Sequence, residues 1–476
     1  MSAGTQTAAS RLAEIAGAPN VLADPAQLLL YEVDGKLPSA VVRPGTAEEV
    51  AEIIKFAAAE KLAVIPTGAR TKLGIGLPPS RYDLALDMTR LNRIVAYDPG
   101  DLTLSVEAGL PLCQLQTAFS EHRQFLPLAV PFMEQSTVGG AIASGVDSPL
   151  RHGYGTARDF VLGMEFVAGD GTAAKSGGRV VKNVTGYDLH KLMIASFGSL
   201  AVITKVNFRT FPQPISSRGF VANFSTGTGA FEMRRKLAQS PLRPLTVELF
   251  SPGVAALFAS HTVELITKVP LSVDPLSNDH WSLTTGFSGN ETLRARNESE
   301  LTRMAKECGA ESVAILGENL GPAWIRKREF VSIALASSPA TTILKIGVVP
   351  NRAINAIDQA ARAAEASGLG WLAMARGVGV IYFVILPAPA AEATESANPA
   401  DAELRIRVAT AARKIASDVH GLGGNFTIPW CPSEWKPALA ELIWGPVSPD
   451  FEQMRKLKSV FDPCRILSPG RFVGGL

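Results

Sequence analysis

Short apolar runs and amphipathic stretches alternate along the first part of the chain. Residues 40–43 and 62–65 have the apolar character of strands, and Thr46 with Glu49 forms a capping-box pattern that begins a helix ending near residue 60. This order predicts a parallel βαβ unit. Further segments with strand character lie at 84–87, 94–97, 102–106, 160–168, 173–175 and 198–206, and a helix is expected near 112–122.

The pattern changes after the proline-containing segment 212–214. Strands and helices now recur in strand–helix–strand units, which predicts an antiparallel sheet with helices on one face. The units are 219–224 with 230–239 and 245–250, 280–286 with 291–307 and 312–316, and 342–348 with 352–367, 371–376 and 380–386. Residues 387–401, rich in alanine, proline and glutamate, predict a disordered loop, and a helix is expected at 403–420.

Three glycine-bearing segments, 64–74, 136–145 and 177–206, are candidates for cofactor binding. Glycine lets a backbone approach a flat or charged ligand closely, and successive exposed N–H groups accept an anion. Each segment alone is also compatible with ordinary tight turns. Segment 64–74 carries Arg70 and Lys72 after a predicted strand, so a pyrophosphate would suit it, although a solvated surface position suits Arg70 equally well. We interpret the three segments together as a large-cofactor site.

Composition limits the possible classes of protein. With 476 residues, 46% of them hydrophobic and 19% charged, the chain can bury at least two cores, and a soluble multidomain protein is expected. A net charge of +2 does not favour nucleic-acid binding. Cys113, Cys308, Cys431 and Cys464 lie far apart, which favours free thiols in a reducing cytosol over disulfides or an iron–sulfur cluster. Neither an export signal nor an integral membrane segment is expected.

The order of the motifs resembles the FAD-binding domain of the vanillyl-alcohol oxidase and p-cresol methylhydroxylase (PCMH) type. The resemblance covers about 34–214 and rests on the entry 41–50, the loop 66–74, Thr137-Val138-Gly139-Gly140, Tyr154-Gly155, Arg158-Asp159 and 198–204. Lys182-Asn183-x-x-Gly186-Tyr187-Asp188-Leu189, together with Phe461-Asp462-Pro463 and Pro469-Gly470-Arg471, is similar to the glycolate oxidase branch, and specifically to its FAD-binding E subunit.

This resemblance implies an α+β fold, in which a two-part PCMH-type FAD-binding domain is joined to an α/β cap domain with an antiparallel sheet. We expect an N-terminal helical segment at 1–33, the FAD-binding domain at 34–214, the cap at 215–420 and a C-terminal segment at 421–476 that returns to the flavin domain. Ser468 replaces the asparagine usual in the tail of relatives, which argues against direct contact of the tail with the flavin.

The cofactor implied is FAD, bound non-covalently because the loop 66–74 offers no histidine for a covalent link. The residues expected to bind it are Pro66, Thr67, Gly68, Ala69, Arg70, Thr71, Lys72, Ser136, Thr137, Gly139, Gly140, Ser144, Gly145, Tyr154, Asn183, Tyr187, Gly198, Ala201, Val202 and Ile203.

Catalytic residues and a metal site are not indicated by this sequence. Hydroxy-acid dehydrogenases of the family carry clustered histidines that bind a divalent metal and take a proton from the substrate. The six histidines here, His122, His152, His190, His261, His280 and His420, do not pair at such spacing. The resemblance therefore implies a subunit of a complex with a catalytic flavoprotein partner and an iron–sulfur partner, located in the cytoplasm or, through its partners, at the inner membrane.

Three functions stay open at this point. The first is an FAD-binding subunit of a glycolate or related 2-hydroxy-acid oxidase complex. The second is an autonomous FAD oxidoreductase of a small hydroxy-acid or alcohol that uses a Tyr or Glu of the cap as its base. The third is a non-catalytic scaffold built on an FAD-binding fold. A nicotinamide enzyme is disfavoured, because no G-x-G-x-x-G follows a predicted strand.

Overall fold

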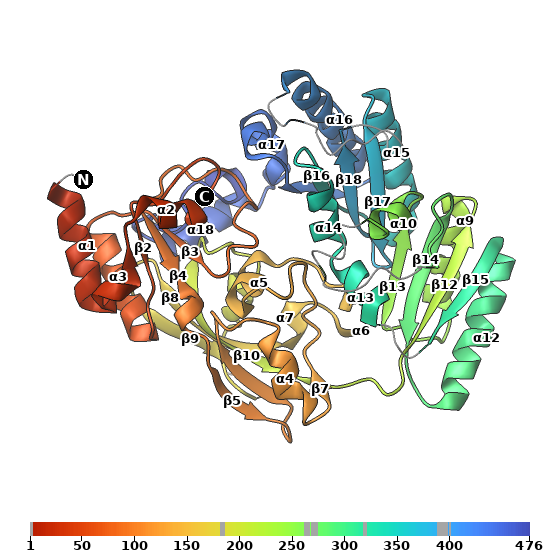
Figure 1. Ribbon diagram of the computed structural model, residues 1–476, viewed down its shortest axis with the longest axis horizontal. Helices are drawn as coiled ribbons and strands as arrows, with labels where there is room; N and C mark the ends of the chain where they lie inside the picture. Colours follow the sequence, from red (N-terminus) through yellow and green to blue (C-terminus); the bar gives the residue numbers. More distant parts are fainter. Residues whose placement is uncertain are drawn as a thin grey trace.

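The computed structural model describes residues 3–180, 186–260, 267, 275–317, 321–387, 398 and 401–476. Two bodies lie side by side in Figure 1: an N-terminal domain, which the chain leaves at β11(Phe211–Pro212), and a cap, which follows it. The C-terminal residues return to the N-terminal domain. Asn183 and most of the loop expected at 387–401 lie outside the described residues.

The first half of the N-terminal domain contains the predicted βαβ unit. Helix α3(Ala47–Ala59) connects β2(Ala40–Val42) to β3(Val64–Thr67), and both strands run parallel to β4(Leu84–Asp87), which lies between them. The Thr46 hydroxyl accepts a hydrogen bond from the Glu49 N–H at 3.1 Å, which caps the first turn as predicted. Helices α1(Ala3–Ala16) and α2(Pro25–Leu28) and strand β1(Val21–Leu22) precede this unit.

The second half is an antiparallel sheet in the order β5-β6-β10-β8-β9. One buried cluster of this half contains Phe160, Met164 and Phe166 of the segment 160–168 and Val206 and Phe208 of the segment 201–209. The strands are β5(Ile94–Asp98), β6(Thr103–Glu107), β8(Val161–Ala168), β9(Ala173–Gly177) and β10(Ala201–Arg209), and the helices are α4(Gln114–Ser120), α5(Val138–Ser144), α6(Arg151–Tyr154), α7(Ala157–Phe160) and α8(His190–Met193). The short strands β7(Gln124–Phe125) and β11(Phe211–Pro212) pair with each other and form a separate two-stranded sheet.

The cap is built on an antiparallel sheet, as predicted, in the order β15-β12-β14-β13-β17-β18-β16-β19 among the described residues. Its strands are β12(Arg218–Phe224), β13(Thr246–Phe250), β14(Trp281–Phe287), β15(Ala310–Leu316), β16(Thr342–Gly347), β17(Gly370–Arg376), β18(Val380–Leu386) and β19(Asn425–Trp430). Because β19 pairs with β16, the sheet extends beyond residue 420, where we expected the cap to end.

Helices cover both faces of the cap sheet, so the prediction of helices on one face is wrong. One face packs under α9(Gly227–Gln239), α12(Glu291–Glu307), α15(Ala353–Ala366) and α16(Ala402–Gly421), and the other packs against α10(Val254–Phe258) and α14(Phe330–Ser337). The reason lies in the strands. Ile381 and Phe383 of β18 point to the first face while Tyr382 and Val384 point to the second, and both sets need cover from water.

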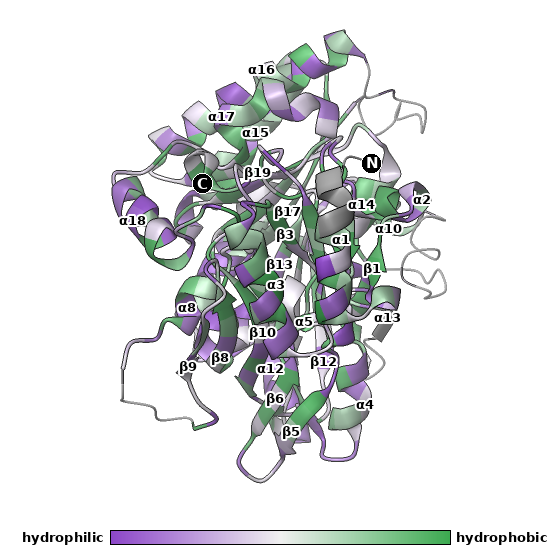
Figure 2. Cartoon of the chain, turned by 90° about the vertical axis from the view of Figure 1, so that its left-hand side faces the viewer, coloured by the Kyte–Doolittle hydropathy of each residue, from purple (hydrophilic) through white to green (hydrophobic). Residues whose placement is uncertain are grey.

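Hydropathy follows this layering. Figure 2 shows mostly hydrophobic colour on interior strands such as β13 and β17, whereas outer turns of α16 and α18(Phe451–Phe461) carry hydrophilic residues. None of the helices in the described ranges is both long enough and apolar enough to span a bilayer.

A buried ion pair anchors the C-terminal tail, defined here as residues 462–476, to the N-terminal domain. The Lys458 ammonium donates to Asp462 Oδ2 at 2.7 Å and to the Ser199 and Leu467 carbonyls at 2.7 and 2.8 Å. The Asp462 carboxylate accepts the N–H groups of Ile466 and Leu467. The tail then runs beside β3, where the Val64 N–H donates to Ile466 and the Val64 carbonyl accepts from Ser468.

We expect Asp462→Asn to lower the free energy of unfolding by about 3–5 kcal/mol, because it leaves the Lys458 ammonium buried without a counter-charge. Urea unfolding followed by tryptophan fluorescence measures this loss. Asp450→Asn at the other end of α18 is the matched control, because the Asp450 side chain makes no capping hydrogen bond. An equal effect of the two substitutions would contradict the assignment of the anchor.

Candidate functional site

The three glycine-bearing segments meet at one cavity, called here the cofactor cavity. The loop after β3 forms one wall, α5 with the Thr137 cap forms the second, and residues 197–203 at the start of β10 form the third. The space is about 790 Å³ including its open side. Two sheets therefore contribute their strand ends to a single binding site.

Glycine is required where these walls approach one another. A Cβ on Gly68 would lie 2.2 Å from the Thr137 hydroxyl oxygen, and a Cβ on Gly139 would lie 2.8 Å from the Ala108 Cβ. Gly198 has a φ of +65°, in the left-handed region that favours glycine. The walls thus present backbone to the cavity, as close binding of a phosphate-containing cofactor needs.

Most residues predicted to bind the cofactor line this cavity. They are Pro66, Thr67, Gly68, Ala69, Arg70, Thr71, Lys72, Thr137, Gly139, Gly140, Ser144, Gly198, Ala201, Val202 and Ile203. Ser136 lies beside them, with its hydroxyl 2.6 Å from the Lys72 ammonium. Gly145 ends α5 with a φ of 57° and packs on Ala195, where a Cβ would lie only 2.4 Å away.

The structure does not bring Tyr154 or Tyr187 to the cavity. The Tyr154 ring packs edge-on against Phe125 and Phe211, each with a centroid distance of 5.1 Å. The Tyr187 side chain is 90% exposed. A glycine-rich pattern locates a backbone turn but not the direction of a neighbouring ring, so nearness in sequence suggested a nearness in space that these two side chains do not have.

Sequence reasoning missed several lining residues, namely Leu73, Ile75, Met88, Ala108, Ala143, Phe197 and Arg471. Arg471 is the most informative, because it comes from the tail and donates to the carbonyls of Leu73 and Ile75. The tail therefore reaches the cavity wall through Arg471, whereas Ser468 is not among the lining residues. The available signal was the motif Pro469-Gly470-Arg471, in which Gly470 has a φ of +84° and packs on Ser80.

Helix α5 also differs from expectation, since we predicted a glycine-rich turn there. The Thr137 hydroxyl accepts a hydrogen bond from the Gly140 N–H at 3.3 Å, and Val138, Ala141 and Ile142 are buried. Capping and burial compensate for the low helix propensity of two successive glycines.

The lining arginines have partners of their own. Arg70 has a φ of 65°, lies 3.8 Å from the Asp87 carboxylate and is positioned 4.6 Å above the Tyr31 ring. The Tyr31 hydroxyl donates to Asp87 at 2.6 Å, and burial, followed by this hydrogen bond, raises the pKa of Tyr31 to about 12. Tyr31 and Asp87 therefore hold Arg70 in place at the cavity wall.

Two family models match the chain. The first, described as an FAD binding domain, matches residues 38–177, and the second, described as the C-terminal domain of FAD linked oxidases, matches 213–472. The chain belongs to the FAD-linked oxidase family. The family resemblance, the cofactor FAD and the class of FAD-dependent oxidoreductase, all predicted from the sequence, are thereby confirmed.

Relatives within the FAD-linked oxidases include two proteins named as glycolate oxidase subunits. The chain is 25% identical to glycolate oxidase subunit GlcD of Bacillus subtilis over 98% of this chain and 97% of that protein. It is 33% identical to glycolate oxidase subunit GlcE of Escherichia coli, over 42% of this chain and 56% of that protein. The second match thus covers little more than half of the relative's length.

A solved structure shares the complete fold of this FAD-linked oxidase. p-Cresol methylhydroxylase with substrate bound superposes with a TM-score of 0.76 over 99% of this chain and 97% of that one, at 19% identity. The predicted fold, a PCMH-type FAD-binding domain with an antiparallel cap, is confirmed. The cavity fits FAD, whose diphosphate suits the glycine-walled turns and whose flat ring suits the apolar Val202, Ile203 and Met88. When bound, FAD supplies a hydride acceptor.

Buried charges join the N-terminal domain to the cap. Arg376 of β17 pairs with Glu248, opposite it on β13, and its Nε lies 3.5 Å from the carboxylate of Asp147. Arg151 adds a contact of 3.2 Å to Asp147. Burial lowers the pKa of Arg376, and Asp147 opposes this shift. Removing any one of these partners would leave a buried charge uncompensated, so the group favours a single orientation of the cap.

Gly68→Ala should reduce the FAD content of the purified protein at least about tenfold, because the new methyl group displaces Thr137 from the cavity wall. The ratio of visible flavin absorbance to protein absorbance measures the content. Gly74→Ala is a matched control in the same loop, since a Cβ there meets nothing within 4 Å. Full FAD content in the Gly68→Ala protein would show that the close approach is dispensable.

Proposed function

We propose that this chain is the FAD-binding subunit of a glycolate or related 2-hydroxy-acid oxidase complex and passes electrons to an iron–sulfur partner. One observation carries the proposal. The cofactor cavity is complete, whereas none of the five described histidines lines it. The residue types that would bind and deprotonate a hydroxy-acid in the histidine-dependent members are therefore placed elsewhere in the described chain.

The contacts of three of these histidines support this interpretation. His190 Nδ1 lies 3.1 Å from the Ser176 hydroxyl, and His280 lies between Ser277 and Glu311, at 2.8 Å from each. The His122 ring packs edge-on against Tyr97. In the described ranges, no group of three or more histidine, cysteine and carboxylate side chains is arranged to hold a metal ion. These contacts are those of structural residues.

The similarity to GlcE, a named subunit, supports membership of a complex. An iron–sulfur cluster is commonly held by four cysteine thiolates. Cys113, Cys308 and Cys431 are partly buried and Cys464 is exposed, and their wide separation in sequence suits free thiols. A separate iron–sulfur protein would then receive the electrons.

A second candidate is an autonomous FAD-dependent dehydrogenase of a small hydroxy-acid. The alignment with GlcD favours it, because that alignment spans 98% of this chain. In such an enzyme the base would come from the cap.

Anaerobic mixing of the purified flavoprotein with glycolate or D-lactate distinguishes the two functions. For a subunit that depends on partners, we expect the flavin absorbance to stay oxidised with either acid and to bleach only when the catalytic and iron–sulfur proteins are added. Bleaching of the isolated chain by either acid would refute the subunit proposal and support the autonomous enzyme. Failure to bind added FAD would refute both.

A further inference from the structure

Lys72 differs from the two arginines that line the cofactor cavity. Arg70 lies near Asp87, and Arg471 donates to backbone carbonyls. The Lys72 ammonium instead donates to two neutral hydroxyls, at 2.6 Å to Ser136 and 3.2 Å to Thr71. No carboxylate of the described residues lies within 4.0 Å of it.

Burial makes this arrangement costly for a cation. Desolvation lowers the pKa of Lys72 to about 7, and the more distant Glu329 carboxylate opposes the shift. An anion in the cavity would compensate the ammonium charge and raise its pKa again. The cavity wall is therefore complete in shape but lacks one negative charge.

We propose that Lys72 is the residue that compensates the negative charge of bound FAD, and that Glu329 of the cap positions Lys72 for this task. The inference rests on the proposed function only in taking FAD to be the cofactor of the cavity. It gives one residue of the cofactor site, Lys72, a specific role, and it gives a specific route by which the cap acts on that residue.

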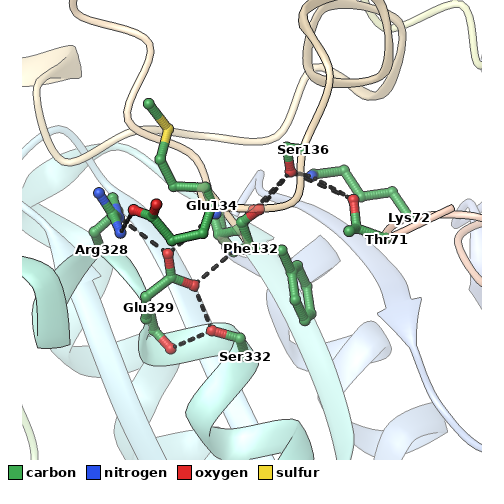
Figure 3. A network of polar contacts seen from close by, with 10 residues as sticks. Thr71, Lys72, Phe132, Glu134, Ser136, Arg328, Glu329 and Ser332 are labelled. Atoms are coloured by element: carbon green, nitrogen blue, oxygen red, sulfur yellow. Dashed lines mark hydrogen bonds and ion pairs between the residues drawn. The ribbon is translucent and has the colours of Figure 1, made fainter. Parts of the chain in front are cut away.

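The route runs through the loop 132–136, shown in Figure 3. The Ser136 hydroxyl donates to the Phe132 carbonyl at 2.8 Å and thereby presents its oxygen to Lys72. Phe132 has a φ of 59°, a left-handed conformation that is unfavourable for a bulky residue and persists only when its surroundings stabilise it.

Glu329, between α13(Gly321–Arg328) and α14, stabilises this conformation of Phe132. Its carboxylate accepts the N–H groups of Phe132 and Met133 at 2.7 and 3.2 Å, the Ser332 hydroxyl at 2.5 Å and Arg328 Nε at 3.0 Å. The side chain is almost fully buried, so these bonds are formed away from water. The cap thus fixes the loop that fixes the Lys72 ammonium.

The charge state of Lys72 should make FAD binding depend on pH. Charged side chains near Lys72 come from its own loop, from the tail, from loop 132–136 and from the cap, namely Arg70, Arg471, Glu134, Arg328 and Glu329. Because an anion raises the pKa of Lys72, affinity is highest below pH 7 and falls as pH rises through the pKa of the free protein towards that of the complex.

The test measures the dissociation constant of FAD from pH 6 to 9, by fluorescence titration of flavin-free protein. Lys72→Met should weaken binding about tenfold or more at pH 6, as expected for loss of a charged hydrogen bond, and abolish the fall above pH 7. Lys72→Arg should bind FAD as tightly as the wild type does at pH 6, and this affinity should not decrease above pH 7. Glu329→Gln should move the decrease in FAD affinity to lower pH. Glu134→Gln, at the half-exposed partner of Arg328, should leave the pH of this decrease unchanged.

Two further measurements show which part of FAD Lys72 contacts. If it is the diphosphate, Lys72→Met weakens ADP binding as much as FAD binding. If it is the flavin end, ADP binding is unchanged and the midpoint potential of the bound flavin falls in the variant. Equal FAD affinity, pH dependence and potential in wild type and Lys72→Met would overturn the inference. A wild-type chain that binds no FAD would instead contradict the proposed function.

Discussion

The close approach of three backbone segments is the constraint on which the rest of this structure depends. Gly68 faces Thr137, Gly139 faces Ala108, and each contact leaves no room for a Cβ. Such approaches persist only if the strands that carry the segments are held rigidly, because loops alone would open to relieve the crowding. The parallel strands β3 and β4 and the long strand β10 provide this rigidity, and their two sheets therefore serve one cavity.

The cap is a structural part of the cofactor site and not a separate lid. Glu329 holds the loop next to Lys72, and Arg376 bridges from the cap sheet to Asp147 of the N-terminal domain. Both contacts involve buried charged groups, whose energies depend steeply on geometry. A small change in cap orientation would thus alter the geometry of the cofactor cavity.

Local patterns predicted the elements well, and long-range contacts set the limit. Thr46 and the apolar run after residue 62 suffice for α3 and β3, because caps and strands are specified by neighbouring residues. Arg471 could not be placed, since nothing near it in sequence specifies its contact with the Ile75 carbonyl. Helix α5 was missed because burial, which sequence alone does not display, outweighs the weak propensity of Gly139 and Gly140. Tyr187 was expected at the cofactor site, but its side chain is exposed, because a residue's place in a motif does not determine the direction of its side chain.

The return of the tail also determines when the cofactor site can exist. The chain forms both sheets of the N-terminal domain by Arg209, then folds the whole cap, and only afterwards supplies Arg471 to the cavity wall. During synthesis the glycine-walled half is thus present long before its last wall. Val64 joins the tail to the N-terminal domain by accepting a hydrogen bond from Ser468 and donating one to Ile466. A closed cofactor cavity in this protein therefore requires Arg471 as well as the three glycine-bearing segments.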